Sequence, residues 1–419
     1  MKIAFLAGDV GNISGGANVI IEYAWRLRAL GHEVVLVTHA PVRLSSPPWH
    51  PRLTELRYQT FREAAGERFD FVFATWWLTW FDLWRLDSAV YGYLNQSLES
   101  RFHAEPHLKH LNRVTYSLPL LFVTEARWLA EFIRTVQPSG QVLYVRNGLS
   151  REHFPCVEAP APRTGPLRVL VEGPWGIPFK GVAETFELLE EARARVELQV
   201  GWLSSSSGGQ VPVVGGRPVR VHERIPINQV REVFQQYDVL LKLSRVEGMF
   251  GPPLEMFSQG GTAITYTVTG SDEYMVHGEN SLLMPPHDRR QLPRYLEVLS
   301  RSPAYLERLR AGALSTARAF PDWEASIGLL ERELRRLHQE GLRNDALRPA
   351  LEAMATLKEH WLDEVRHVAE VSLDAGPGER LLLERYRKLK RGSGVQALKQ
   401  LVPDSLKQSV RTFFTRRLE

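Results

Sequence analysis

The 419-residue chain has a single cysteine, Cys156, and therefore cannot form an intramolecular disulfide. It has no Cys-x-x-Cys pair and no run of Cys and His at zinc-binding spacing, so the sequence predicts no metal site. It lacks the roughly 18 consecutive apolar residues that a membrane-spanning helix needs. The apolar stretch at residues 1–8 is too short for a signal peptide. We therefore expect a cytoplasmic protein.

Most of the chain carries little net charge of either sign. Lys and Arg number 52 and Asp and Glu 48, which gives a net charge of +4. Residues 379–419 contain eleven basic and four acidic residues, so this segment carries +7 and residues 1–378 carry −3. Nucleic-acid binding requires basic residues over the working surface. We therefore expect no nucleic-acid partner.

The remaining composition, 44% hydrophobic and 24% charged, is that of an ordinary globular protein, and the length predicts two or three domains. Apolar strands alternate with helical segments up to about residue 338, a pattern typical of parallel sheets covered by helices. A proline-rich stretch at 155–166 separates two such halves. We predict α/β domains at 1–155 and 156–338, followed by a helical, basic extension at 339–419.

A glycine loop with Gly15 and Gly16 follows the first strand and precedes a helix at 17–30. It is not Gly-x-Gly-x-x-Gly, and no acidic residue follows the second strand, so the sequence lacks an ordinary dinucleotide fingerprint. The glycines allow a ligand to approach the backbone closely. A plain tight turn is the alternative interpretation.

The segment 244–261 is the most specific in the chain. Glu247 follows a predicted strand, at the edge of the sheet where open α/β folds bind ligands. Pro252 suits the first position of a helix, which puts Glu255 in its first turn. Two carboxylates are thus expected to face one crevice. The alternative is a surface loop with two solvated acids.

Lys180 lies between the first strand and the first helix of the second half, at the predicted mouth of the same crevice. An ammonium group there can neutralise a diphosphate leaving group. A solvated surface lysine is the alternative.

Taken in order, these elements resemble the retaining glycosyltransferases of family 4, over about residues 1–337. The matching elements are Gly15-Gly16, Asn147-Gly148, Lys180-Gly181, Glu247 with Glu255, Gly270 to Glu273, and Gly278 to Leu283. The run from Pro252 to Met256, with segments 74–77 and 91–99, resembles the rhamnosyltransferase-like branch. The resemblance implies a GT-B fold, in which two Rossmann-like domains face an interdomain cleft.

The resemblance also implies roles for individual residues. Lys180 would hold the donor diphosphate, Glu255 the ribose hydroxyls and Glu247 the transferred sugar. The other expected donor-binding residues are Gly15, Gly16, Arg245, Gly248, Met249, Phe250 and Gly251. Because the sequence has no Asp-x-Asp, we expect no cofactor and no metal.

Two features depart from the family. Trp175 stands where an arginine is usual, and Arg245 is a candidate for the missing charge. No histidine of the first domain is an obvious catalytic residue; the nearest are His103, His107 and His110. The aromatic cluster from Trp76 to Trp84 is interpreted as core packing or, alternatively, as an acceptor groove.

The predicted function is transfer of a hexose or deoxyhexose from a nucleoside-diphosphate sugar to a glycan or lipid-linked acceptor. A nucleotide-sugar epimerase of GT-B fold and a non-catalytic sugar-nucleotide-binding protein are the alternatives. The basic segment 379–419 is interpreted either as a peripheral contact with the inner face of the membrane or as a helix packed on the body or on another copy in a homo-oligomer.

Overall fold

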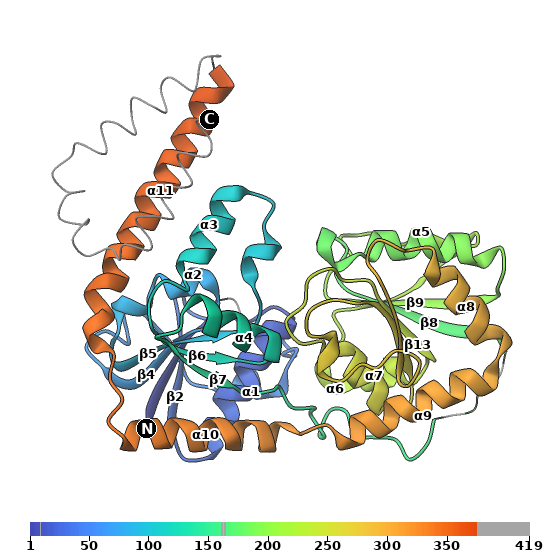
Figure 1. Cartoon of the computed structure of the whole chain (residues 1–419), viewed down its shortest axis with the longest axis horizontal. Helices are drawn as coiled ribbons and strands as arrows, with labels where there is room; N and C mark the ends of the chain where they lie inside the picture. The colour runs from blue at the N-terminus through green and yellow to red at the C-terminus, as the bar shows by residue number, and fades with distance from the viewer. Residues whose placement is uncertain (9, 161, 163–164, 375–419) are drawn as a thin grey trace.

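The computed structural model describes residues 1–374, except residues 9, 161 and 163–164. The predicted membrane or partner contact at 379–419 lies outside the described residues. Within them, the chain forms two α/β domains side by side (Figure 1). The predicted α/β class, with two Rossmann-like domains and a helical C-terminal part, is confirmed.

The first domain is a seven-stranded parallel sheet in the order β3-β2-β1-β4-β5-β6-β7. Its strands are β1 (Lys2–Leu6), β2 (Glu33–Thr38), β3 (Tyr58–Thr60), β4 (Arg68–Ala74), β5 (Asp87–Asn95), β6 (Leu121–Thr124) and β7 (Gln141–Tyr144). Its helices are α1 (Gly15–Ala29), α2 (Trp77–Trp80), α3 (Pro106–Val114) and α4 (Arg127–Val136), with short 3-10 turns η1 (Pro51–Thr54), η2 (Leu83–Arg85) and η3 (Glu99–Phe102).

Strand β1 shows that this sheet is buried on both faces. Ile3 and Phe5 pack into the core beneath α1, whereas Ala4 and Leu6 pack into the core on the opposite face. Successive side chains of a strand point to opposite faces, so a strand covered on both sides must be apolar throughout.

The second domain is a six-stranded parallel sheet in the order β12-β9-β8-β13-β14-β15, with a separate antiparallel pair β10-β11. The strands are β8 (Leu167–Glu172), β9 (Leu198–Ser204), β10 (Val213–Val214), β11 (Arg217–Pro218), β12 (Arg220–Glu223), β13 (Val239–Lys242), β14 (Thr262–Tyr266) and β15 (Ser281–Met284). The helices are α5 (Val182–Arg193), α6 (Ile227–Phe234), α7 (Pro252–Ser258), α8 (Gln291–Arg301) and α9 (Pro303–Ala319), with 3-10 turns η4 (Pro178–Lys180) and η5 (Ser271–Glu273).

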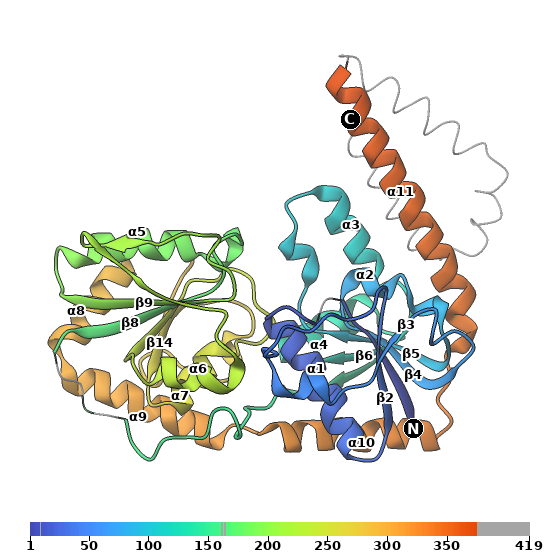
Figure 2. The same cartoon turned by 180° about the vertical axis from the view of Figure 1, so that it is seen from behind.

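The chain then returns to the first domain. Helix α10 (Trp323–Gln339) packs with α1 on the core of the first sheet, as Figure 2 shows from behind. After η6 (Asp345–Leu347), helix α11 (Arg348–Asp374) begins against the other face of that sheet. The domain limits at 155 and 338 stay a prediction, but in space residues 323–339 complete the first domain's core.

Among the described helices, none contains an apolar stretch long enough to cross a lipid bilayer.

Candidate functional site

The candidate site lies where the second sheet changes direction. Successive strands run from β8 outward to β9 and β12 on one side and from β13 to β15 on the other. In open α/β sheets, the loops on either side of such a switch point, here those that leave β8 and β13, are where ligands bind. Lys180 follows β8, and Glu247 follows β13. The two residues singled out in the sequence thus come from opposite sides of this switch point.

The structure brings these two side chains into contact. Lys180 Nζ lies 2.9 Å from Glu247 Oε1, and Lys242 Nζ lies 3.4 Å from the same oxygen. Lys242 also forms a close ion pair with Glu172. The Lys–Glu cluster therefore consists of Lys180, Lys242, Glu172 and Glu247.

Sequence reasoning missed Glu172 and Lys242, although each is the last residue of its strand. Val171 of β8 is paired in register with Leu241 of β13, so the next residues along both strands are neighbours. The sequence does contain a signal for both residues. A charged residue at the end of a buried parallel strand lies at the edge of the sheet where ligands bind.

The charges of the cluster set the ionisation of Glu247. Burial by itself opposes ionisation, but the attraction of Lys180 and Lys242 is stronger and lowers the pKa of Glu247 to about 2. Glu247 is therefore a carboxylate at any physiological pH. Each lysine beside it is a cation that an anionic ligand can share.

Glu255 lies in the first turn of α7, where Pro252 and Pro253 begin the helix as the sequence predicts. Burial, together with the negative charge of Glu172, raises the pKa of Glu255 to about 8. The two glutamates thus differ in ionisation at neutral pH. A neutral carboxylic acid can both donate and accept a hydrogen bond, which suits a hydroxyl-bearing ligand.

Gly181 allows Lys180 to be presented at the start of α5. Its φ is +68°, and a Cβ atom there would lie 2.2 Å from the carbonyl oxygen of Leu243. Only glycine accepts both the left-handed backbone and this close approach. The β8 and β13 loops can therefore lie directly against each other.

Loop 244–251 also touches the first domain. The carbonyl oxygen of Gly248 accepts a hydrogen bond from Trp128 Nε1 at 3.1 Å. The amide of Met249 donates to Glu125 Oε1 at 3.0 Å. A Cβ atom on Gly248 would lie 1.8 Å from the carbonyl oxygen of Gln96, so only glycine fits at this interface.

Glu125 is a first-domain carboxyl that sequence reasoning missed. It follows β6 directly and also accepts a hydrogen bond from Asn147. Burial raises its pKa to about 8. Its position after a parallel strand is the signal that could have identified it.

A second carboxylate also makes contacts across the interface, this time from the second domain to the first. Glu273, in η5 of the second domain, accepts hydrogen bonds from the amide of Arg127 and the hydroxyl of Tyr144, both at 2.5 Å. Arg146 lies 3.4 Å from it. The side chains of Glu125, from the first domain, and Glu273, from the second, therefore link the carboxyl-terminal edges of the two sheets.

The other predicted donor-binding residues lie around this interface or beside it. Gly15 and Gly16 begin α1, and the Gly16 carbonyl accepts a hydrogen bond from Gln96 Nε2 at 3.3 Å. Arg245 pairs with Glu184 at 2.6 Å, so Lys242 is the second cation observed beside Glu247.

Phe250 is buried, and its carbonyl accepts a hydrogen bond from the Tyr274 hydroxyl at 2.7 Å. Gly251 precedes the first turn of α7. These two residues fix the backbone between Glu247 and Glu255. Their predicted part in donor binding stays a prediction.

Trp175 replaces the expected arginine with aromatic packing. Its ring centroid lies 5.8 Å from that of Trp202 and 6.2 Å from that of Phe186. Of the three histidines, His103 packs edge-on against Trp77 and His110 stacks on Trp361.

The aromatic cluster divides into core and interface. Trp77, Trp80 and Phe81 are buried in the first domain. Trp76 stacks on Phe102 at 5.9 Å, and Phe102 stacks on Phe179 of the second domain at 5.1 Å. Because Phe179 precedes Lys180, this stack connects first-domain aromatic rings to the Lys–Glu cluster.

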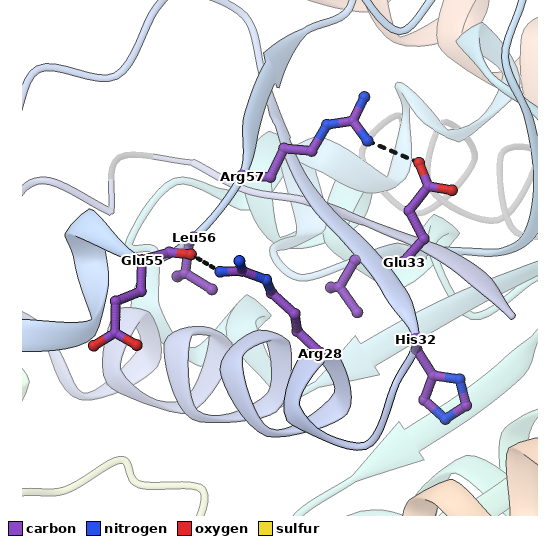
Figure 3. A pocket seen from close by; sticks show the side chains of 7 residues that line it. Arg28, His32, Glu33, Glu55, Leu56 and Arg57 are labelled. Carbon is purple, nitrogen blue, oxygen red and sulfur yellow. Dashed lines mark hydrogen bonds and ion pairs between the residues drawn. The ribbon is translucent and has the colours of Figure 1, made fainter.

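An open surface pocket of about 330 Å³ lies elsewhere (Figure 3). Glu33, at the amino end of β2, pairs there with Arg57 at 2.7 Å, and Arg28 donates to the Glu55 carbonyl. The pocket thus borders the amino-terminal edge of the first sheet, whereas the candidate site lies at the carboxyl-terminal edges of the sheets. Its charged groups already have partners.

Comparison with solved structures supports the fold. Sucrose-phosphate synthase from Thermosynechococcus elongatus is 16% identical with a TM-score of 0.62, covering 81% of this chain and 99% of its own. Anabaena HepE in complex with UDP-glucose is 16% identical with a TM-score of 0.60, covering 80% and 100%. The lipopolysaccharide outer core galactosyltransferase WaaB is 16% identical with a TM-score of 0.57, covering 80% and 100%.

No protein-family model matches the chain. No curated protein sequence matches it either. The structural likeness over four fifths of the chain, together with the two parallel sheets, assigns the GT-B fold.

Proposed function

We propose that the protein is a retaining, metal-independent glycosyltransferase that moves a hexose or deoxyhexose from a nucleoside-diphosphate sugar to a glycan or lipid-linked acceptor. One observation carries the proposal: Lys180 and Glu247 meet at the switch point of the second sheet. The similarity to HepE, whose structure holds UDP-glucose, supports a nucleotide-sugar donor.

In the proposed reaction, the bond between the anomeric carbon and the diphosphate oxygen breaks, and its electron pair leaves with the diphosphate. The acceptor hydroxyl forms the new bond on the same face of the sugar and passes its proton to the departing oxygen. Positive charge positioned where the leaving group develops its negative charge is a major source of rate enhancement. Lys180 supplies that charge by turning from Glu247 to the diphosphate.

Lys242 keeps Glu247 ionised when Lys180 turns away, because it stays within 3.4 Å of Glu247 Oε1. Glu247 can then accept hydrogen bonds from sugar hydroxyls, while Glu255 binds the ribose. The stack of Trp76, Phe102 and Phe179 borders the interface, where its aromatic rings would contribute apolar contacts to an acceptor sugar. We place the reaction in the cytoplasm or at the inner face of the membrane.

The first experiment identifies the donor. A panel of nucleoside diphosphates and their sugars is screened for thermal stabilisation, since a ligand bound only to the native state raises its stability. The selected donor is then incubated with candidate acceptors, and the anomeric configuration of the product is determined by NMR. Retention is expected, and added Mg²⁺ or Mn²⁺ should leave the rate unchanged.

The second experiment tests Glu247. We expect Glu247→Gln to lower the transfer rate by about 100-fold or more, in the range found when one group that stabilises a transition state is removed. Glu187→Gln, an exposed position on α5, is the matched control and should transfer at the wild-type rate. Wild-type transfer by Glu247→Gln would contradict the proposal, and so would isomerised donor formed without acceptor.

A further inference from the structure

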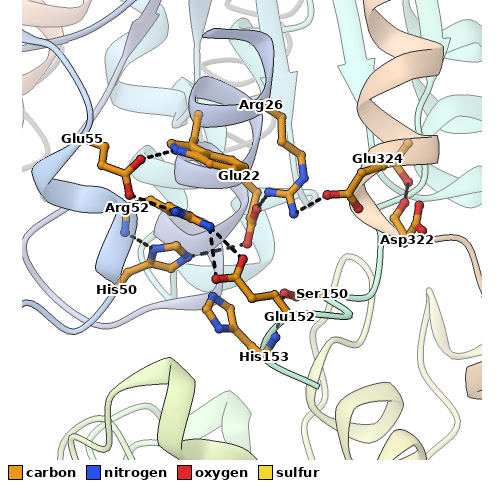
Figure 4. A network of polar contacts seen from close by, with 12 residues as sticks. Glu22, Arg26, His50, Arg52, Glu55, Ser150, Glu152, His153, Asp322 and Glu324 are labelled. Atoms are coloured by element: carbon orange, nitrogen blue, oxygen red, sulfur yellow. Dashed lines mark hydrogen bonds and ion pairs between the residues drawn. The ribbon is translucent and has the colours of Figure 1, made fainter. Parts of the chain in front are cut away.

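Two buried histidines and a buried glutamate from three separate segments meet in the first domain (Figure 4). Glu22 is on α1, His50 precedes η1, and His153 follows the isolated bridge that pairs Leu149 with Asp322. One potential ligand atom from each residue lies within 4.8 Å of the other two.

His50 has a buried ring nitrogen, Nε2, that makes no hydrogen bond. The side chain is 0% exposed. Nε2 lies 3.6 Å from Glu22 Oε1, beyond hydrogen-bonding distance. Buried polar atoms are almost always paired, so an orphan nitrogen that faces a carboxylate and a second imidazole points to a missing ligand.

We propose that Glu22, His50 and His153 bind one Zn²⁺ or a similar divalent transition metal. Two imidazoles and one carboxylate are ligands that zinc prefers, whereas Mg²⁺ and Ca²⁺ favour all-oxygen sites. The sequence alone predicts no metal, because these residues are 28 and 103 positions apart and only the fold brings them together.

The charges around the cluster are compatible with a cation. Arg26 binds Glu22 through the other carboxylate oxygen, Oε2, and leaves Oε1 facing His50. Arg52 is occupied by Glu55 and Glu152, at 3.0 and 2.9 Å. The network in Figure 4 contains the guanidinium groups of Arg26 and Arg52, and its carboxylates outnumber them, so its formal charge is −3. The carboxylates are Glu22, Glu55, Glu152, Asp322 and Glu324.

Metal binding requires a small local rearrangement. Zinc–nitrogen bonds of about 2.0–2.1 Å put tetrahedral ligand atoms about 3.4 Å apart, so the three side chains must move inward. His50 Nδ1 accepts the amide hydrogen of Arg52 at 3.1 Å, which places the ring proton on Nε2. On coordination through Nε2, that proton moves to Nδ1 and the Arg52 amide loses its acceptor.

The bound metal would connect α1 to the segment that links the domains. Trp49, next to His50, accepts a hydrogen bond from the amide of Ile227 in the second domain at 3.0 Å. His153 lies at the start of the interdomain linker. The metal would therefore stiffen the connection between the domains, through residues that are not part of the Lys–Glu cluster.

The experiment uses the full chain without a histidine tag, stripped with a chelator and titrated with Zn²⁺ by calorimetry. We expect one Zn²⁺ per chain and a higher melting temperature. A zinc-edge anomalous map of crystals should show a peak between Glu22, His50 and His153. Co²⁺ should give the absorption spectrum of a four-coordinate site, with water as the fourth ligand beside two imidazole nitrogens and one carboxylate oxygen.

Variants separate this site from adventitious binding. His153→Gln should weaken Zn²⁺ affinity at least about 10- to 100-fold, as the loss of groups that support a metal site does. His222→Gln, which removes a buried histidine bonded to Tyr237, is the control and should bind zinc like the wild type. Circular dichroism confirms that each variant is folded.

Three results would overturn the proposal: equal zinc affinity in the two variants, an anomalous peak elsewhere, or no stoichiometric binding by the wild type. The anomalous map and the Co²⁺ spectrum use the unmodified chain, so a variant that fails to fold does not remove the test. None of these measurements depends on glycosyl transfer.

Discussion

Replacing Lys242 with methionine removes one charge from the centre of the Lys–Glu cluster while keeping a side chain of similar length. Lys242 is 3% exposed and is the partner of both Glu172 and Glu247. After the substitution, Lys180 is the remaining lysine of the cluster and pairs with Glu247, whereas Glu172 loses its cation. The substitution therefore breaks a buried ion pair by removing one of its members.

The expected cost follows from burial. Removing one partner of a buried pair costs about 3–5 kcal/mol, because the remaining charge is left without compensation. Lys180 is 22% exposed, and Lys242 stays beside Glu247 when Lys180 is removed. We therefore expect Lys180→Met to cost only about 1 kcal/mol, the upper end for an ion pair that is open to solvent.

The two substitutions should affect donor binding in the opposite order from stability. Lys180→Met removes the cation proposed to bind the donor diphosphate, so it should lower donor affinity more than Lys242→Met does. Differential scanning calorimetry measures the unfolding midpoint of the second domain, since two domains need not unfold in one transition. Donor affinity is measured by calorimetry on the folded variants.

A double variant provides the internal control. Adding Glu172→Gln to Lys242→Met removes the carboxylate that has lost its cation, whereas Glu247 keeps Lys180, and should recover part of the lost stability. The reasoning would be refuted if Lys242→Met and Lys180→Met lowered the unfolding midpoint equally. It would also be refuted if the double variant with Glu172→Gln unfolded at a lower temperature than Lys242→Met alone.

Two other predictions concern the interface and the second glutamate. Gly248→Ala places a Cβ atom 1.8 Å from the Gln96 carbonyl, so we expect it to separate loop 244–251 from the first domain at a cost of about 1–3 kcal/mol. Small-angle scattering should show a more open molecule, and an unchanged profile would contradict the contact. The raised pKa of Glu255, about 8, means that its ionisation increasingly opposes folding as pH rises from about 4.5 to 8. Glu255→Gln should therefore raise the melting temperature more at pH 9 than at pH 5, and an equal change at both would argue against a neutral Glu255.

Much of the candidate site could be predicted because it depends on local order along the chain. The positions of Lys180 after β8 and Glu247 after β13 follow from strand periodicity and from the rule that loops at the carboxyl edge bind ligands. Pro252 marks the start of α7 for an equally local reason, since its missing amide hydrogen is not needed in the first turn.

Lys242 and Glu125 were not predicted, although each stands at the carboxyl end of a strand or directly after it. Lys242 ends an apolar run and looks like the boundary of a buried strand. Its role depends on the register that places it beside Glu172, and strand register is not visible in one strand's sequence.

By itself, the sequence determined the alternation of strands and helices, the division into two sheets, and the loops that carry Lys180 and Glu247, because hydrophobic periodicity and turn residues act over short distances. Only the tertiary structure decided that α10 returns to the first domain and that Glu125 and Glu273 cross the interface in opposite directions. It also decided that Glu22, His50 and His153 meet. These contacts join residues far apart in the chain, and their geometry is set by the packing of whole elements.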